Sequence, residues 1–439
     1  MRHTYIKFFA SLALLIAPLH IVAQEIFTSE FAPYEMRQDA ESGRRTQREY
    51  YLDFEPKALN DKEYRYTFEL PEKWSDRAVM LHLEGVASAF DLAVNGKNVA
   101  AVEDSFSPTT FDITPYITKI GANNITVILR SSHHAILEQG VSIPTPAKLF
   151  EGSCITAHHK VRIMDYAVTL TPDPTSQFGI LDVAIQVYNG FNFDETIEVG
   201  YDIYDPAGKL HEFSTSKATL KSGERDTVTF RPYIYGTYTG SNLWSPSSPK
   251  LYRVMLYVKR NNILTDYIPL KIGFDETTYK DGSIVRFGEA INIKSSRYNA
   301  TTTKAATLSQ IKALKAKGIN TLCPDYPQPL WFYELCDEVG MWVVDQLNIN
   351  STQSPDNRKI GGTPANDPKL LDEYMTRAKR AYFRGRNFNC IIGYSLGGDT
   401  SGNGYNMQKL YRWFKVVETK RPIIYAPAGE EWNNDNIKL

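Results

Sequence analysis

The sequence predicts a multidomain β plus α/β protein, and three observations indicate this class. The chain has 439 residues, enough for about three domains of ordinary size. Through most of the stretch from 62 to 273, apolar and polar residues alternate with the period of two that is typical of half-buried strands. From Gly273-Phe274 onward, apolar strands alternate with segments of helical period, which predicts parallel β/α units.

The chain begins with the features of a secretory signal peptide, predicted over residues 1–23. Basic residues lie between Met1 and Lys7, the apolar run Phe8 to Val22 follows, and cleavage is expected after Ala23. The run is too short for a membrane span, and no later stretch reaches the 18 or so apolar residues that a transmembrane segment needs. We therefore expect an exported, soluble protein, in a periplasm or outside the cell.

The next part of the chain, residues 24–160, is predicted to be an antiparallel sandwich. Asn95-Gly96 between two alternating runs is a strong hairpin signal. Residues 161–273 continue with strands of the same period. The predicted strands of both parts are Tyr64–Leu70, Ala78–Leu83, Ala89–Val94, Ile125–Leu129, Ile180–Val187, Thr227–Phe230 and Leu251–Val258.

Residues 274–439 carry the β/α alternation. The predicted strands are Ala290–Arg297, Gly318–Cys323, Met341–Gln346, Cys390–Leu396 and Pro422–Tyr425, and the predicted helices are Thr303–Lys317, Gln328–Val339, Asp367–Arg386 and Tyr405–Glu418. Asp367-Pro368 is a helix-start signal, because Asp caps a helix and Pro fits its first turn. About five parallel strands therefore fit in this part.

Composition excludes some functions. The net charge is −1, so nothing indicates a nucleic-acid partner. The four cysteines, Cys154, Cys323, Cys336 and Cys390, show no metal-ligand spacing. Buried free thiols are expected, and a disulfide, which export would permit, is the alternative. We therefore expect neither a cofactor nor a bound metal.

Three motifs resemble glycoside hydrolase family 2, the β-galactosidase and β-glucuronidase family. The stretch Glu84–Ile117 is similar to its N-terminal sugar-binding jelly roll, and Leu243–Val254 is similar to a phrase of its immunoglobulin-like β-sandwich. The segment Asn387–Gly404 resembles the strand that carries its catalytic acid/base. The resemblance implies a jelly roll at 24–160, an immunoglobulin-like domain at 161–273 and a partial (β/α)8 TIM-type barrel at 274–439.

The barrel is expected to be incomplete. A complete (β/α)8 barrel takes about 250 residues and rarely fewer than 200, more than the stretch 274–439 provides. An open parallel sheet leaves an apolar edge. Either a protein partner or a second copy covers that edge, or the sheet closes in a reduced way, or the sequence is truncated.

The residues that the family uses on sugar are changed. Retaining glycosidases need two carboxylates about 5–5.5 Å apart. Asp399 stands where the family has its acid/base Glu, after Gly397-Gly398 in place of Gly-Asn. Its side chain is one methylene shorter, and a misplacement of about 1 Å can cost about 10²-fold in rate. The nucleophile position is expected beyond residue 439.

The supporting residues differ as well. Cys323 and Asp325 stand at an Arg and a His of the family pattern, and Gln346 and Asn350 stand at two Glu positions. Amides in place of carboxylates remove the charge that a hard cation requires. Asp325, Asn348, Tyr394 and Asp399 still fall at the carboxyl ends of predicted strands, and Asn292 is the one residue kept from the family's opening-strand phrase. The candidate substrate-binding residues are Asn292, Asp325, Tyr326, Gln346, Asn348 and Tyr394, with Asp399 as the candidate catalytic residue.

Three functions follow from this pattern. The first is a catalytically impaired or inactive member that binds carbohydrate or a protein partner. The second is a retaining exo-β-glycosidase of β-galactosidase type, active in glycan breakdown, with Asp399 as acid/base and its nucleophile supplied from outside this chain. The third is a structural subunit of a cell-surface assembly.

Overall fold

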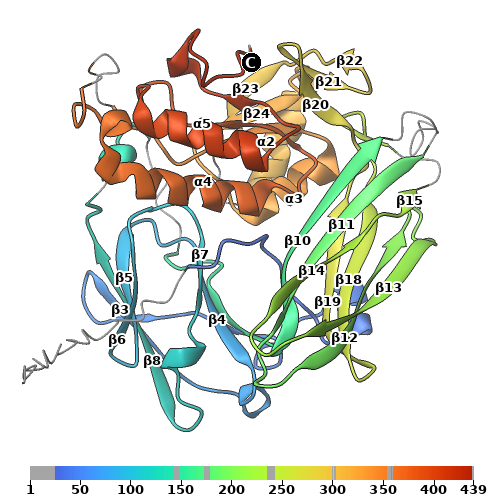
Figure 1. Ribbon diagram of the computed structural model, residues 1–439. Coiled ribbons are helices and arrows are strands. Elements are labelled where there is room, and N and C mark those ends of the chain that lie inside the picture. The colour runs from blue at the N-terminus through green and yellow to red at the C-terminus, as the bar shows by residue number, and fades with distance from the viewer. Residues whose placement is uncertain are drawn as a thin grey trace, which may run out of the picture.

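The computed structural model describes residues 25–133, 135–141, 148–172, 178–234, 243–298, 300, 303–352, 357 and 359–437. The predicted signal peptide lies outside these residues. Two β-sandwiches are followed by a β/α part; Figure 1 shows the β/α part above the first sandwich, with the second sandwich beside both. Among the described residues, no helix is long and apolar enough to cross a membrane.

The first sandwich consists of two antiparallel sheets with strand orders β1-β9-β4-β7 and β2-β3-β8-β5-β6. The alternation seen in the sequence places Phe90, Leu92 and Val94 in its core. Asn95 and Gly96 both have positive φ, as the predicted two-residue hairpin turn requires. The strands are Tyr51–Asp53 (β1), Lys57–Ala58 (β2), Glu63–Glu69 (β3), Ala78–Leu83 (β4), Ala89–Val94 (β5), Lys97–Val102 (β6), Thr109–Asp112 (β7), Ala122–Arg130 (β8) and Cys154–His158 (β9).

The second sandwich is also antiparallel, with β10-β11-β14 facing β13-β12-β18-β19 and β15 paired with β11. Its core is rich in Val, Ile and Tyr, because β-branched and aromatic side chains pack well on a pleated surface. The strands are Val161–Pro172 (β10), Gly179–Asn189 (β11), Glu195–Tyr204 (β12), Leu210–Leu220 (β13), Arg225–Phe230 (β14), Tyr233–Ile234 (β15), Tyr252–Arg260 (β18) and Ile263–Ile272 (β19), with Trp244–Ser245 (β16) and Ser248–Pro249 (β17) as a separate short pair.

The β/α part has the predicted five parallel strands, in the order β23-β24-β25-β26-β27. They are Ser295–Tyr298, Thr321–Pro324, Trp342–Gln346, Ile391–Ser395 and Ile423–Ile424, and the helices beside them are Lys304–Ala316 (α2), Leu330–Val339 (α3), Leu371–Gly385 (α4) and Tyr405–Val417 (α5). The side chain of Asp367 accepts the N–H of Lys369 in the short helical turn that leads into α4. The fold class predicted from the sequence is therefore confirmed.

One strand differs from its prediction. The expected opening strand Ala290–Arg297 starts only at Ser295, because Glu289–Ala290 forms β22 and pairs with β21 (Ser283–Arg286), which also pairs with β20 (Thr277–Lys280). The N–H of Ile291 still donates to the carbonyl of Ile284 in that ribbon. Asn292 consequently precedes the parallel sheet.

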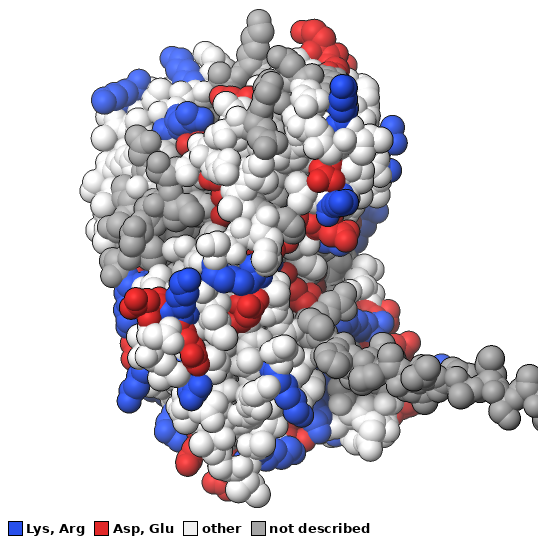
Figure 2. Space-filling view, turned by 90° about the vertical axis from the view of Figure 1, so that its left-hand side faces the viewer, with Lys and Arg blue, Asp and Glu red and all other residues white. Residues whose placement is uncertain are grey.

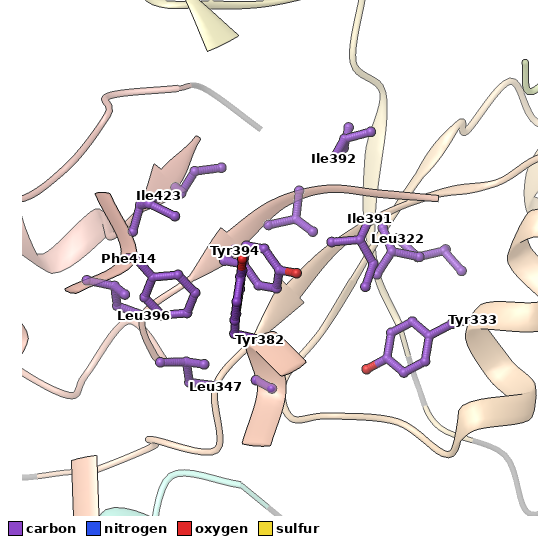
Figure 3. Packing of buried hydrophobic residues seen from close by; sticks show 14 of the residues in the cluster. Leu322, Tyr333, Leu347, Tyr382, Ile391, Ile392, Tyr394, Leu396, Phe414 and Ile423 are labelled. Carbon is purple, nitrogen blue, oxygen red and sulfur yellow. The ribbon is translucent and has the colours of Figure 1, made fainter. Parts of the chain in front are cut away.

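The main core of the β/α part lies between the sheet and its helices. Figure 3 shows Tyr394 of β26 among Tyr382 of α4 and Phe414 of α5. Tyr394 is fully buried, and its hydroxyl accepts a hydrogen bond from Arg421 Nη1 at 3.1 Å. The structure thus places Tyr394 in the core, away from the surface where a ligand was predicted.

Candidate functional site

The loops that follow β24 and β25 meet at the carboxyl edge of the parallel sheet. Gln346, the last residue of β25, donates from Nε2 to the carbonyl of Asp325 at 2.6 Å and to Asn350 Oδ1 at 3.0 Å. Asn350 Nδ2 donates to the same carbonyl at 2.9 Å. The structure therefore brings Asp325, Gln346 and Asn350 together, and we call this group the amide cluster.

The loop after β26 packs against the amide cluster. The N–H of Gly398 donates to the carbonyl of Ile349 at 2.8 Å. A Cβ added at Gly398 would lie 2.4 Å from Asn350 Oδ1, and one at Gly397 would lie 2.6 Å from the Ile349 carbonyl. Real Cβ atoms do not approach other atoms so closely, so the glycine pair is what allows the two loops to touch.

Asp399 follows this glycine pair and is exposed at the rim. The pKa of the buried Tyr425 hydroxyl is raised well above its ordinary value, mainly by burial and further by Tyr374 and the charge of Asp399. The predicted catalytic carboxylate thus lies near the amide cluster, at the carboxyl end of its strand.

An ion pair and an aromatic pair border the amide cluster. Asp325 Oδ1 lies 2.8 Å from Nε of Arg297 in β23, whose side chain is 65% exposed. The ring of Tyr326 lies 4.4 Å, centre to centre, from the ring of Phe106 in the first sandwich. Burial raises the pKa of the Tyr326 hydroxyl to about 12, so it stays protonated. Charged donors and acceptors beside half-buried rings can bind the hydroxyls and the apolar face of a small polar ligand.

Asn348 has a different role from the predicted one. It is fully buried, and its Nδ2 donates to Asp104 Oδ1 at 2.7 Å and to Glu138 Oε1 at 2.9 Å. Its own carbonyl accepts a hydrogen bond from Arg377 Nη1 at 2.7 Å. Asn348 therefore joins the β/α part to the first sandwich instead of facing a ligand.

Asn292 also lies apart from the other candidates. Its carbonyl accepts a hydrogen bond from Asn320 Nδ2 at 2.8 Å, and Asn320 immediately precedes β24. In a parallel sheet the amino ends of all strands share one edge, so Asn292 is at the edge opposite the amide cluster.

The sequence interpretation missed a set of buried ion pairs between α4 and the N-terminal part of the chain. Arg377 Nη1 lies 2.8 Å from Glu138 Oε1, and Arg380 Nε lies 2.7 Å from Glu25 Oε1. Burial favours the neutral form of Asp104, but Arg377 and Arg380 outweigh it and lower the pKa of Asp104. The signal was present in the sequence: arginines at positions 377, 380 and 384 have the spacing of a single helix face.

The amide cluster offers little to a hard cation. Its oxygens belong to amides and to one peptide carbonyl, and the Asp325 carboxylate is already paired with Arg297. Magnesium and calcium sites usually draw on free carboxylates.

On the face that Figure 2 shows, basic and acidic side chains are interspersed, in keeping with the small net charge.

Comparison with known families gives three matches in chain order. Residues 46–150 match the sugar binding domain of glycosyl hydrolases family 2, residues 161–274 match the model named glycosyl hydrolases family 2, and residues 295–438 match the TIM barrel domain of the same family. These ranges correspond to the two sandwiches and the β/α part.

Individual proteins with known names are similar as well. A β-galactosidase of Psychromonas ingrahamii is 29% identical over 383 residues, and one of Priestia megaterium is 28% identical over 379 residues. These alignments cover 84% and 83% of this chain and 36% of each relative, so the chain spans about a third of their length. A solved structure of Bacteroides uniformis β-glucuronidase superposes with a TM-score of 0.67 at 17% identity, over 92% of this chain and 52% of the other.

Proposed function

The chain belongs to glycoside hydrolase family 2, and from this premise we propose that it is an exported carbohydrate-binding protein whose glycosidase activity is impaired or absent. Export is supported by the signal-like residues 1–23. The sugar-binding model matched at 46–150 supports a carbohydrate ligand.

The contact between Gly398 and Asn350 carries the proposal of impaired activity. Asn350 Oδ1 fills the space that a side chain at position 398 would occupy, since a Cβ there would lie only 2.4 Å away. The family pattern has Asn at position 398 and Glu at positions 399 and 350. This chain has Gly, Asp and Asn instead, so the changes fall on two loops that touch. A family-type side chain at position 398 does not fit unless Asn350 moves.

Binding is supported by the groups that remain available at this edge. Arg297 and Asp325 present a charged pair, and Phe106 with Tyr326 presents half-buried rings. Because Phe106 belongs to the first sandwich and the other three to the β/α part, the ligand would contact both.

A retaining exo-β-glycosidase of β-galactosidase type is the second candidate. Similarity to two named β-galactosidases supports it. Asp399 would act as the acid/base, and the second carboxylate would come from residues outside these 439. The ligand of this chain would then be a substrate.

Hydrolysis of aryl β-galactosides, β-glucuronides and β-mannosides tests the proposal of impaired activity. We expect the purified chain to turn over none of them above the rate of its Asp399→Ala variant. Turnover that Asp399→Ala abolishes would overturn the proposal of impaired activity and show that Asp399 is catalytic.

Calorimetric titration with galactose and with glucuronic acid tests binding directly. We expect measurable affinity for at least one sugar and a loss of at least fivefold in Arg297→Gln. Arg65→Gln is the matched control, because Arg65 is exposed in β3 and pairs with Glu63 in the same strand. Equal affinity in both variants would place the ligand elsewhere.

A further inference from the structure

Three atoms that can bind a metal converge between the N-terminal segment and the first sandwich. Their residues are different from those of the amide cluster. The atoms belong to Glu30, His82 and Glu84, and one ligand atom of each residue lies within 4.8 Å of those of the other two. His82 Nε2 is 3.6 Å from Glu30 Oε1 and 3.5 Å from Glu84 Oε2. Each residue is partly buried.

Local structure explains the convergence. His82 lies in β4 and Glu84 two residues later, so both side chains point to the same face of the sheet. Glu30 reaches that face from the segment before α1 (Arg37–Ser42), which is anchored where Ile26 N donates to the Thr110 carbonyl at 3.1 Å. The three ligands therefore come from two separate stretches of chain that the fold holds together.

The imidazole is oriented for binding through Nε2. Its Nδ1 lies 3.0 Å from Oγ1 of Thr110, the residue directly opposite His82 on β7. When Nδ1–H donates to that hydroxyl, the lone pair of Nε2 faces the two carboxylates. Metal-binding histidines commonly use their second nitrogen in this way to fix the ring.

Arg384 supports the two carboxylates from behind. Its Nε lies 3.0 Å from Glu30 Oε2, and its Nη2 lies 3.8 Å from Glu84 Oε1. Each carboxylate thus turns one oxygen to Arg384 and the other to His82. The guanidinium holds both side chains in place and leaves the inner oxygens available.

The separations suit a metal better than a hydrogen bond. The two N–O distances of 3.5 and 3.6 Å exceed the range of about 2.7–3.2 Å for good N–H···O bonds. Two ligands of a tetrahedral zinc ion lie about 3.4 Å apart, since each bond is about 2.0–2.2 Å long. We propose that Glu30, His82 and Glu84 bind a zinc-type divalent cation, with the fourth position open to the adjoining cavity.

That cavity has a volume of about 840 Å³ and lies between the three parts of the protein. Cys154, opposite His82 on β9, also lines it. The three ligand atoms that converge are one nitrogen and two oxygens. The bound cation would link the N-terminal segment to β4. The sequence does not predict this site, because Glu30 and His82 show no metal-ligand spacing.

Zinc titration of the chelator-treated chain tests the site. In competition with a chromophoric chelator, we expect one high-affinity zinc ion per chain and a rise in melting temperature on binding. Glu30→Gln, His82→Gln and Glu84→Gln should each weaken binding at least tenfold. Glu55→Gln and His133→Gln are the matched controls, since both residues are exposed, and they should bind as the wild type does. Unchanged affinity in all three site variants would overturn the proposal.

X-ray absorption of the zinc-loaded wild type covers the case in which a variant does not fold. We expect a shell of nitrogen and oxygen at about 2.0–2.2 Å with the outer-shell signature of an imidazole. A shell with sulfur at about 2.3 Å, or the failure of the wild type to bind zinc, would refute the site.

Discussion

Asp345 in β25 provides the sharpest test of how the β/α part is held together. It is 2% exposed, and its Oδ1 accepts a hydrogen bond from the Tyr333 hydroxyl at 2.7 Å. Burial raises the pKa of this carboxyl from 3.8 to about 7, against the opposing effects of the Tyr333 hydroxyl and Arg384. The folded protein therefore keeps a proton that the unfolded chain releases.

The direction of the pH dependence follows from this difference. The contribution of Asp345 to stability is fully present below about pH 4, falls as the pH rises through the window up to about pH 7, and is constant above it. A pKa difference of one corresponds to about 1.4 kcal/mol. The difference of about three therefore lowers the free energy of unfolding by about 4 kcal/mol in total.

Asp345→Asn removes this dependence and keeps the acceptor for Tyr333, because an amide has nearly the shape of a protonated carboxyl. We expect the stability of the variant relative to the wild type to increase by about 3 kcal/mol between pH 5 and pH 8. Urea unfolding at a series of pH values measures it, with Asp61→Asn at an exposed position as control. A difference in unfolding free energy, variant minus wild type, that stays constant or decreases from pH 5 to pH 8 would refute the reasoning.

Three further changes test other contacts. Replacing Arg377 by Met removes the buried cation 2.8 Å from Glu138 and leaves Asp104 with Arg380 alone, and urea unfolding should show a loss of about 3–5 kcal/mol. Gly398→Asn places a Cβ 2.4 Å from Asn350 Oδ1 and should cost about 1–3 kcal/mol, most of which a second change, Asn350→Ala, should recover in a double-mutant cycle. Trp244→Phe removes a buried hydrogen bond of 2.8 Å to a carbonyl of α3 and should cost about 1–3 kcal/mol in thermal unfolding.

The strands were the most predictable part of this protein. Ala78–Leu83 and Ala89–Val94 have the predicted bounds, because alternating burial imposes a period of two on the sequence. The opening parallel strand was misplaced, since Ala290 continues an antiparallel ribbon and an apolar pattern alone does not distinguish the two sheets.

The direction of each side chain was harder to predict than its position along the strand. Tyr394 and Ser395 are neighbours near the end of β26, and successive residues of a strand point to opposite faces. The position near the carboxyl end suggested ligand contact for Tyr394, but its face packs on α4 and α5. Which face is buried depends on helices whose residues lie elsewhere in the sequence.

The segment from Gln346 to Asn350 shows why the site can change while the fold persists. The side chains of Gln346 and Asn350 bond to each other and to the Asp325 carbonyl, all within the loops at this edge. Asn348, between them, points the other way and bonds to Asp104 and Glu138 in the first sandwich. Substitution of Gln346 or Asn350 alters the side chains that the edge of the sheet presents to a ligand. Substitution of Asn348 removes buried hydrogen bonds between the β/α part and the first sandwich. Because the two functions fall on different residues of one short segment, a family member can lose its catalytic chemistry at this edge and still fold.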